Sequence, residues 1–78
     1  MSTNMKTDMT LNEIIAKRIK ELRKEKGLNQ IETARILNID KSTIAKYETG
    51  VAVPSLNMLV TLATFFEVSA DFLLGLED

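Results

Sequence analysis

The segment NQIETARILNIDKSTIAKYETG, residues 29–50, constrains the fold more than any other part of the chain. Its apolar residues recur at helical spacing and predict two short helices, over residues 30–37 and 41–48. Asn29 has the N-cap position of the first helix. Gly50 follows the second helix, and glycine readily adopts the left-handed backbone that ends a helix. The segment therefore predicts two helices that pack across a tight turn.

The turn and the helix starts carry their own local signals. Asn38 stands in the turn, and asparagine is among the few non-glycine residues that tolerate a left-handed backbone. Ile39 is expected to plug the corner between the helices. Glu32 follows Asn29 at the spacing of a capping box, and Asp40 is the expected N-cap of the second helix. These residues predict where each helix begins.

The second helix has two dissimilar faces. Its apolar face carries Ile44 and Tyr47, and the first helix is expected to pack with Ile31, Ala34 and Leu37. The other face is polar and free of acids, with Lys41, Ser42, Thr43 and Lys46. Such a surface at the start of a helix suits a DNA groove. The alternative, a helix face that is merely solvated, stays open at this point.

Composition excludes several classes of function. The 78 residues allow one domain with a modest core, and a helical bundle is the economical solution. Cysteine and histidine are both absent, which removes thiolate chemistry and the commonest metal ligand and general base. No glycine-rich phosphate loop or carboxylate cluster is present, so an enzyme is the weakest class and no cofactor or metal is expected. No apolar run is long enough for a membrane span and the amino terminus lacks a signal core, so the expected location is cytoplasmic.

The charges are distributed unevenly along the chain, which the net charge does not show. The net charge is −1, which argues mildly against a nucleic-acid binder. All ten bases, however, lie in residues 1–50 beside seven acids, for a net +3. Residues 51–78 hold four acids and no base, for a net −4. Phosphate binding depends on a local basic face rather than on the total charge.

The rest of the chain predicts three more helices around this pair. Residues 1–9 are expected to form a flexible tail and residues 10–78 a single domain. Thr10 with Glu13 forms a capping box before a helix with the inner stripe Leu11, Ile14, Ile15, Ile19 and Leu22. Ser55 caps a fourth helix whose expected stripe is Leu56, Leu59, Val60, Ala63 and Phe66. A fifth starts at Ser69 and is expected to cover the core with Phe72, Leu73 and Leu76. The fold class is all-α, with five helices.

Four motifs in this order resemble the lambda-repressor-like family of phage and bacterial DNA-binding regulators, the Cro/C-repressor or XRE type. They are LRKEKGLNQ at 22–30, STIAKYETG at 42–50, PSLNMLVTLA at 54–63 and VSADFLLG at 68–75. The chain departs from the family pattern at three positions. Asn38 replaces a glycine, and Phe65 replaces a small residue. Thr33 replaces a leucine, so the helix is expected to bury less apolar surface at that position.

The resemblance implies roles for particular residues. Lys41, Ser42 and Lys46, with Thr43 beside them, match positions that read bases in the major groove. Contacts to DNA phosphates are expected from Gln30, Lys17, Arg18, Lys26 and Thr49. Arg23 and Glu48 match a structural ion pair that joins the first helix to the end of the recognition helix.

Phe65 and Phe66 are adjacent, so one ring is expected to reach the surface. A dimer patch of Leu62, Phe65, Phe72 and Leu76 follows as one interpretation. Tighter packing at that end of the bundle is the other.

Two functions follow from these observations. The first is a sequence-specific regulator of transcription, expected to be a repressor and a homodimer on a pseudo-palindromic operator of double-stranded DNA. It would be bacterial or phage-encoded and associated with the nucleoid. Phage-type repressors, restriction controllers and antitoxins all fit this description. The second is a module that binds a protein partner, such as an anti-repressor, an antitoxin or a coactivator subunit. Neither function calls for a small-molecule substrate or a membrane.

Overall fold

The computed structural model describes residues 9–78 and shows five helices in that range. Their bounds are α1 (Leu11–Glu25), α2 (Gln30–Leu37), α3 (Lys41–Thr49), α4 (Leu56–Phe66) and α5 (Ala70–Leu73). No strand occurs within residues 9–78, so the all-α prediction is confirmed there. The predicted flexible tail, residues 1–9, lies outside the described residues apart from Met9, which is exposed.

The helix starts form as the sequence predicts. Thr10 and Glu13 make both bonds of a capping box at α1, and Asn29 and Glu32 make both at α2. Such caps satisfy amides that have no partner within the helix. At α3 the N-cap residue is the predicted one, but its side chain does not make the capping hydrogen bond. Asp40 is the N-cap residue, yet its side chain accepts no capping hydrogen bond.

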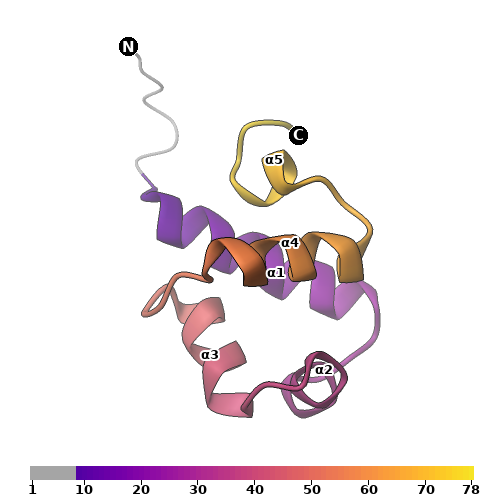
Figure 1. Cartoon of the computed structure of the whole chain (residues 1–78). Coiled ribbons are helices and arrows are strands. Elements are labelled where there is room, and N and C mark those ends of the chain that lie inside the picture. The colour runs from indigo at the N-terminus through magenta and orange to yellow at the C-terminus, as the bar shows by residue number, and fades with distance from the viewer. Residues whose placement is uncertain (1–8) are drawn as a thin grey trace.

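The helices are arranged around α1 (Figure 1). In this view α2 and α3 lie on one side of α1, α5 lies on the other side, and α4 crosses in front. A loop at residues 50–55 joins the end of α3 to the start of α4, and Pro54 within it is buried. The arrangement leaves α3 at one end of the molecule, opposite α5.

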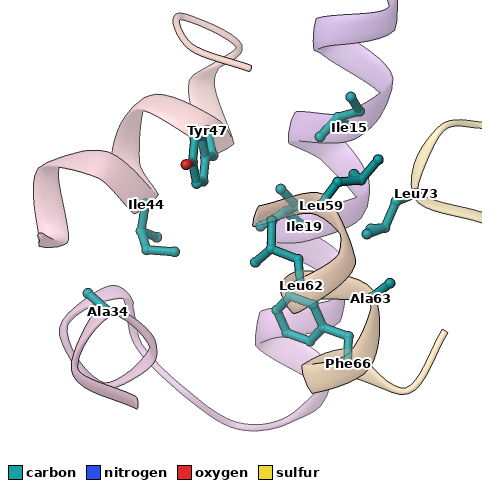
Figure 2. Close-up of a cluster of buried hydrophobic side chains, with 10 residues drawn as sticks. All are labelled: Ile15, Ile19, Ala34, Ile44, Tyr47, Leu59, Leu62, Ala63, Phe66 and Leu73. Atoms are coloured by element: carbon teal, nitrogen blue, oxygen red, sulfur yellow. The ribbon is translucent and has the colours of Figure 1, made fainter. Parts of the chain in front are cut away.

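The core lies where all five helices meet, and ten buried apolar side chains form one cluster (Figure 2). Ile19, Ile44, Leu62 and Leu73 have no exposed surface, and each comes from a different helix. Thr33 is also fully buried although it is polar. Its hydroxyl donates to the Asn29 carbonyl at 3.0 Å, so the threonine is accommodated without an unpaired polar group.

The inner stripes are narrower than the sequence predicts. Five residues that were expected to be inside are exposed: Leu11, Ile31, Leu56, Val60 and Leu76. In α4 the buried face is made by Leu59, Leu62, Ala63 and Phe66 instead. The centre of each apolar stripe was therefore predicted correctly. The residues at the edge of the stripe, which were expected to be buried, face solvent instead.

Candidate nucleic-acid interface

The turn between α2 and α3 fixes how α3 is presented. Asn38 has φ 59° and ψ 45°, the left-handed conformation predicted for it. The Ile39 amide then donates to the Ala34 carbonyl at 2.9 Å, which closes the end of α2. Ile39 itself packs against the core as a half-buried plug. The chain therefore leaves α2 and enters α3 across three residues with a defined geometry.

One face of α3 is buried and the opposite face is open. Ile44, Tyr47 and Glu48 are buried, and burial raises the pKa of the Tyr47 phenol above its ordinary value. Four side chains on the other face are exposed: Lys41, Ser42, Lys46 and Thr49. Thr43, which was expected to point outward with them, is half-buried at the edge of this face. The predicted base-reading residues are thus brought together on one surface, and their role in reading bases stays a prediction.

A shallow hollow separates the first turns of α2 and α3. It has a volume of about 350 Å³ and is lined by Arg23, Asn29, Gln30, Ile31 and Lys41. The first residue of α2, Gln30, and the first residue of α3, Lys41, therefore border the same space. Free amides at helix N-termini attract anions. The hollow thus combines the cationic side chains of Arg23 and Lys41, the amide side chains of Asn29 and Gln30, and two helix starts.

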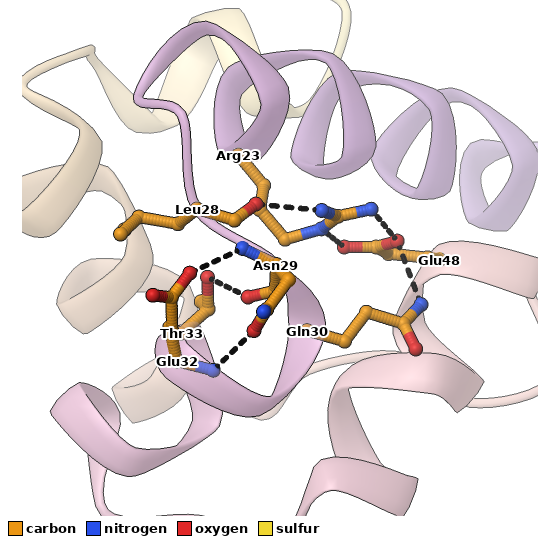
Figure 3. A network of polar contacts seen from close by, with 7 residues as sticks. All are labelled: Arg23, Leu28, Asn29, Gln30, Glu32, Thr33 and Glu48. Carbon is orange, nitrogen blue, oxygen red and sulfur yellow. Dashed lines mark hydrogen bonds and ion pairs between the residues drawn. The ribbon is translucent and has the colours of Figure 1, made fainter.

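A buried ion pair underlies this surface (Figure 3). Arg23 Nε lies 2.5 Å from Glu48 Oε2, and Arg23 Nη2 lies 3.0 Å from Glu48 Oε1. Arg23 Nη1 also donates to the Leu28 carbonyl at 2.7 Å. The predicted structural ion pair between Arg23 and Glu48 is therefore confirmed. The hydrogen bond to Glu48 raises the pKa of Arg23, against a smaller opposing effect of burial, so the guanidinium stays charged.

Gln30 extends the ion pair to α2. Its Nε2 donates to Glu48 Oε1 at 3.0 Å, so one carboxylate oxygen accepts from both Arg23 and Gln30. The amide nitrogen has a second hydrogen, which this bond leaves free for a phosphate. Glu48 thus holds the side chain of Gln30 at the rim of the hollow.

Two of the predicted phosphate-binding side chains have other partners. Arg18 contacts the carboxyl-terminal part of the chain, and its expected contact with a DNA phosphate stays a prediction. Its Nη1 donates to the carbonyls of Phe72 and Glu77, both at 3.0 Å, and its guanidinium lies 4.2 Å from the Phe72 ring centroid. Arg18 therefore faces α5, on the opposite side of α1 from α3 (Figure 1). Lys26 lies over Phe65, with Nζ 5.0 Å from the ring centroid.

The other two predicted phosphate ligands remain exposed. Lys17 pairs with Glu21 across one turn of α1 at 3.8 Å, and both side chains are largely exposed. Exposed pairs of this kind are weak and yield readily to a stronger partner. Thr49 is exposed at the end of α3 and donates its hydroxyl to the Lys46 carbonyl at 3.2 Å. Contact of these residues with DNA stays a prediction.

The predicted dimer patch does not exist as one surface. Leu62 has no exposed area, so including it in a patch was wrong. Phe65 is half-buried, packs edge-on against Phe66 at 4.9 Å between centroids and is covered by Lys26. Phe72 is covered by Arg18. Leu76 alone of the four is strongly exposed. One ring of the adjacent pair Phe65 and Phe66 was expected to reach the surface. This is true in part, because Phe65 is half-buried while Phe66 is buried.

Ile31 is a surface residue that the sequence did not reveal. Its apolar character placed it in the core, yet 55% of it is exposed and it borders the hollow beside Lys41. In α2 it lies about 100° around the helix axis from Gln30, at the edge of the buried stripe. The side chain is thus positioned with the polar residues of the candidate interface.

Two other kinds of site are absent within residues 9–78. No group of three or more acidic side chains is arranged there to hold a metal ion. None of the helices in that part of the chain is both long and apolar enough to cross a membrane.

These features define a helix-turn-helix domain of the class found in DNA-binding regulators. A family model described as Helix-turn-helix matches residues 19–73, which is more than half of the chain. The chain belongs to this family, in its XRE-type branch, as the resemblance predicted.

Known relatives agree with this assignment. The chain is 48% identical over 60 residues to the HTH-type transcriptional regulator AnsR of Bacillus subtilis, covering 77% of this chain and 52% of AnsR. It is 36% identical over 64 residues to the HTH-type transcriptional regulator ImmR of the same organism, covering 82% of this chain and 50% of ImmR. A crystal structure of an HTH_3 family transcriptional regulator from Vibrio cholerae matches with a TM-score of 0.73 and 27% identity, over 86% of this chain and 38% of that one. The chain spans about half the length of the two curated relatives.

Proposed function

We propose that this chain binds double-stranded DNA sequence-specifically and regulates transcription, with α3 in the major groove. The single observation that carries the proposal is the open face of α3, where Lys41, Ser42 and Lys46 are exposed together and no acid lies among them. Lysine donates to guanine O6 and N7, and serine can serve several bases. The names of the relatives support the same activity.

Phosphate contacts would orient the domain on the duplex. The hollow between the starts of α2 and α3 offers Gln30 and Lys41, and Thr49 lies at the far end of α3. Such contacts position a protein without reading sequence. They place the domain so that the amino-terminal turn of α3 faces the base edges.

The regulator would act as a homodimer on a pseudo-palindromic operator. Two copies related by a two-fold axis would meet half-sites about 34 Å apart, one turn of DNA. A regulator of this kind works in the bacterial cytoplasm, on the nucleoid, and repression follows where the operator overlaps a promoter.

Fluorescence anisotropy tests the proposal. The duplex comes from the region upstream of the chain's own gene, with a scrambled duplex of equal composition as the control. We expect tight binding to the native duplex, and a log affinity that falls with log salt by about 0.9 for each phosphate contacted. Equal binding to both duplexes at every salt concentration would contradict sequence-specific recognition of this region. No binding to either duplex, even at low salt, would favour the second function, a protein-binding module.

The base-reading residues are tested in the same assay. Lys46→Ala removes a lysine from the open face, and Lys24→Ala removes an exposed lysine from α1 with the same change in charge. We expect Lys46→Ala to reduce the preference for the native duplex by about 1–3 kcal/mol, the worth of one good base contact. Lys24→Ala should leave that preference unchanged. If both variants lost the same amount of preference for the native duplex, Lys46 would act through its charge and not through a base contact.

A further inference from the structure

The hollow between the starts of α2 and α3 has one apolar side chain on its rim. That side chain is Ile31, which is 55% exposed and lines the hollow together with Gln30 and Lys41. A single exposed isoleucine is ordinary on a protein surface. Ile31 differs because it lies within the surface that is proposed to face DNA, where every other lining residue is polar or charged.

The charges around this hollow do not favour an anion. Arg23 lines it, but the carboxylate of Glu48 neutralises the guanidinium. Lys41 is exposed and directly follows the exposed Asp40, and the exposed Glu32 lies in the first turn of α2. Two cations and three carboxylates therefore belong to this region. A DNA strand that lies here is held by amides at the helix starts and by contacts that are not ionic.

We propose that Ile31 makes an apolar contact with a deoxyribose of the DNA strand whose phosphate lies against Gln30 and Lys41. The contact depends on the proposed function, because it requires DNA at the starts of α2 and α3. Each phosphate of a strand is joined to a sugar on both sides, so a side chain on the rim of a phosphate site lies next to a sugar. Removing the isoleucine and the sugar carbons from water together is favourable.

The structure fixes where Ile31 lies relative to the phosphate contact. Gln30 and Ile31 are consecutive in α2, so their side chains are about 100° apart around the helix axis. Gln30 Nε2 donates one hydrogen to Glu48 Oε1 at 3.0 Å, which leaves the other for a phosphate oxygen. Because Gln30 and Ile31 border the same hollow, a phosphate bound by this amide has one of its sugars within reach of Ile31.

Ile36 on the same helix is a matched comparison. It is 56% exposed, nearly the same fraction as Ile31, but it does not line the hollow. It lies five residues further along α2, about 7.5 Å along the axis. If exposure of an isoleucine on α2 were enough to affect DNA binding, both residues would contribute. A sugar contact at the hollow requires Ile31 alone.

Fluorescence anisotropy of the full chain across a series of salt concentrations tests the proposal. We expect Ile31→Ala to raise the dissociation constant about five- to tenfold, the effect of three carbon groups half removed from water. An apolar contact releases no counterion, so the slope of log affinity against log salt should stay the same. Lys41→Ala removes a cation and should make that slope shallower. Ile36→Ala should bind as the wild type does.

Two controls sharpen the test. Alanine favours the helix and neither isoleucine belongs to the core, so both variants should fold, which circular dichroism and urea unfolding check. A native duplex with deoxyuridine in place of thymidine keeps every sugar and loses the thymine methyl groups. On this duplex Ile31→Ala should weaken binding by the same factor. If the effect of Ile31→Ala disappears there, Ile31 contacts a base and the sugar contact is refuted.

The remaining outcomes separate the sugar contact from the proposed function. If the wild type binds native and scrambled duplexes equally and Ile31→Ala weakens both, the sugar contact stands and sequence-specific recognition fails. If the wild type prefers the native duplex and Ile31→Ala binds as tightly as Ile36→Ala, the proposed function stands and the sugar contact is refuted. A loss in Ile31→Ala that comes with a shallower salt slope would also refute it. Absence of binding to either duplex at low salt would refute both.

Discussion

Replacing Glu48 with alanine would leave Arg23 charged and buried without its partner. Glu48 accepts from Arg23 Nε at 2.5 Å, from Arg23 Nη2 at 3.0 Å and from Gln30 Nε2 at 3.0 Å. The exposed fractions of the two whole residues are 8% for Arg23 and 9% for Glu48. After the substitution Arg23 keeps its hydrogen bond to the Leu28 carbonyl, but no carboxylate balances its charge. Removing one partner of a buried ion pair costs about 3–5 kcal/mol.

That cost is large relative to the stability of so small a domain. At about 0.05–0.15 kcal/mol per residue, 78 residues correspond to a total of about 4–12 kcal/mol. We therefore expect Glu48→Ala to lower the urea midpoint strongly, or to leave the chain largely unfolded at 25 °C. Urea unfolding followed by circular dichroism measures the change. The control is Glu21→Ala, which breaks the exposed pair with Lys17 and should cost at most about 0.5 kcal/mol.

A double variant separates the charge from the contact. Arg23→Met with Glu48→Leu replaces both partners by apolar side chains, and such replacements are often neutral or stabilising. We expect the double variant to be much more stable than Glu48→Ala. The reasoning is refuted if Glu48→Ala lowers the free energy of unfolding by less than about 1 kcal/mol, since a buried unpaired charge destabilises a protein by more than that. It is also refuted if the double variant is as unstable as the single one.

Three further substitutions have defined outcomes. Asn38→Ala should cost about 1–2 kcal/mol in thermal unfolding, because alanine resists the left-handed backbone, whereas Asn38→Gly should be close to neutral. Arg18→Ala removes the hydrogen bonds to the carbonyls of Phe72 and Glu77, so amide hydrogen exchange should accelerate in residues 70–77 and not in α3. The pKa of Tyr47 is raised by burial, so the unfolded chain ionises first and stability falls as the pH rises above about 10. Tyr47→Phe should remove that part of the fall, and in the wild type the tyrosinate absorbance of this single tyrosine should appear only above that pH.

Local chemistry made the helix boundaries predictable. The capping boxes at Thr10 and Asn29 need residues only three positions apart, and both form. The left-handed backbone of Asn38 likewise follows from a preference of that residue type. These features depend on neighbours in the sequence, so no knowledge of the tertiary structure was needed to place them.

The edges of the buried stripes were not predictable in the same way. Helical spacing places Leu56, Leu59 and Val60 on one broad face, but it does not say how much of that face a neighbouring helix covers. In the structure Leu59 is buried, while Leu56 and Val60 remain exposed. Leu62 was assigned to the surface and lies in the centre of the core. Which flank of α4 is covered depends on how it crosses α1, and that angle is set by the whole bundle.

The candidate site likewise has features that the sequence predicts and features that depend on the tertiary structure. The open face of α3 could be predicted, because it is what remains after the apolar residues of one helix are assigned to the core. The partners of Arg18 and Lys26 could not be predicted, because Phe72 and Phe65 are far from them in the sequence. A lysine or arginine beside an aromatic ring is attracted to its face, and this interaction competes with a phosphate for the same charge.

The buried ion pair links the stability of the fold to the geometry of the candidate site. An apolar pair could hold α1 against α3, but it would give Gln30 no acceptor. With Glu48 in place, a single carboxylate neutralises Arg23 from α1 and fixes the amide of Gln30 from α2. Because Glu48 belongs to α3, the orientation of Gln30 at the rim of the hollow follows α3. The residue proposed to contact phosphate and the helix proposed to read bases are therefore held in register by one buried charge.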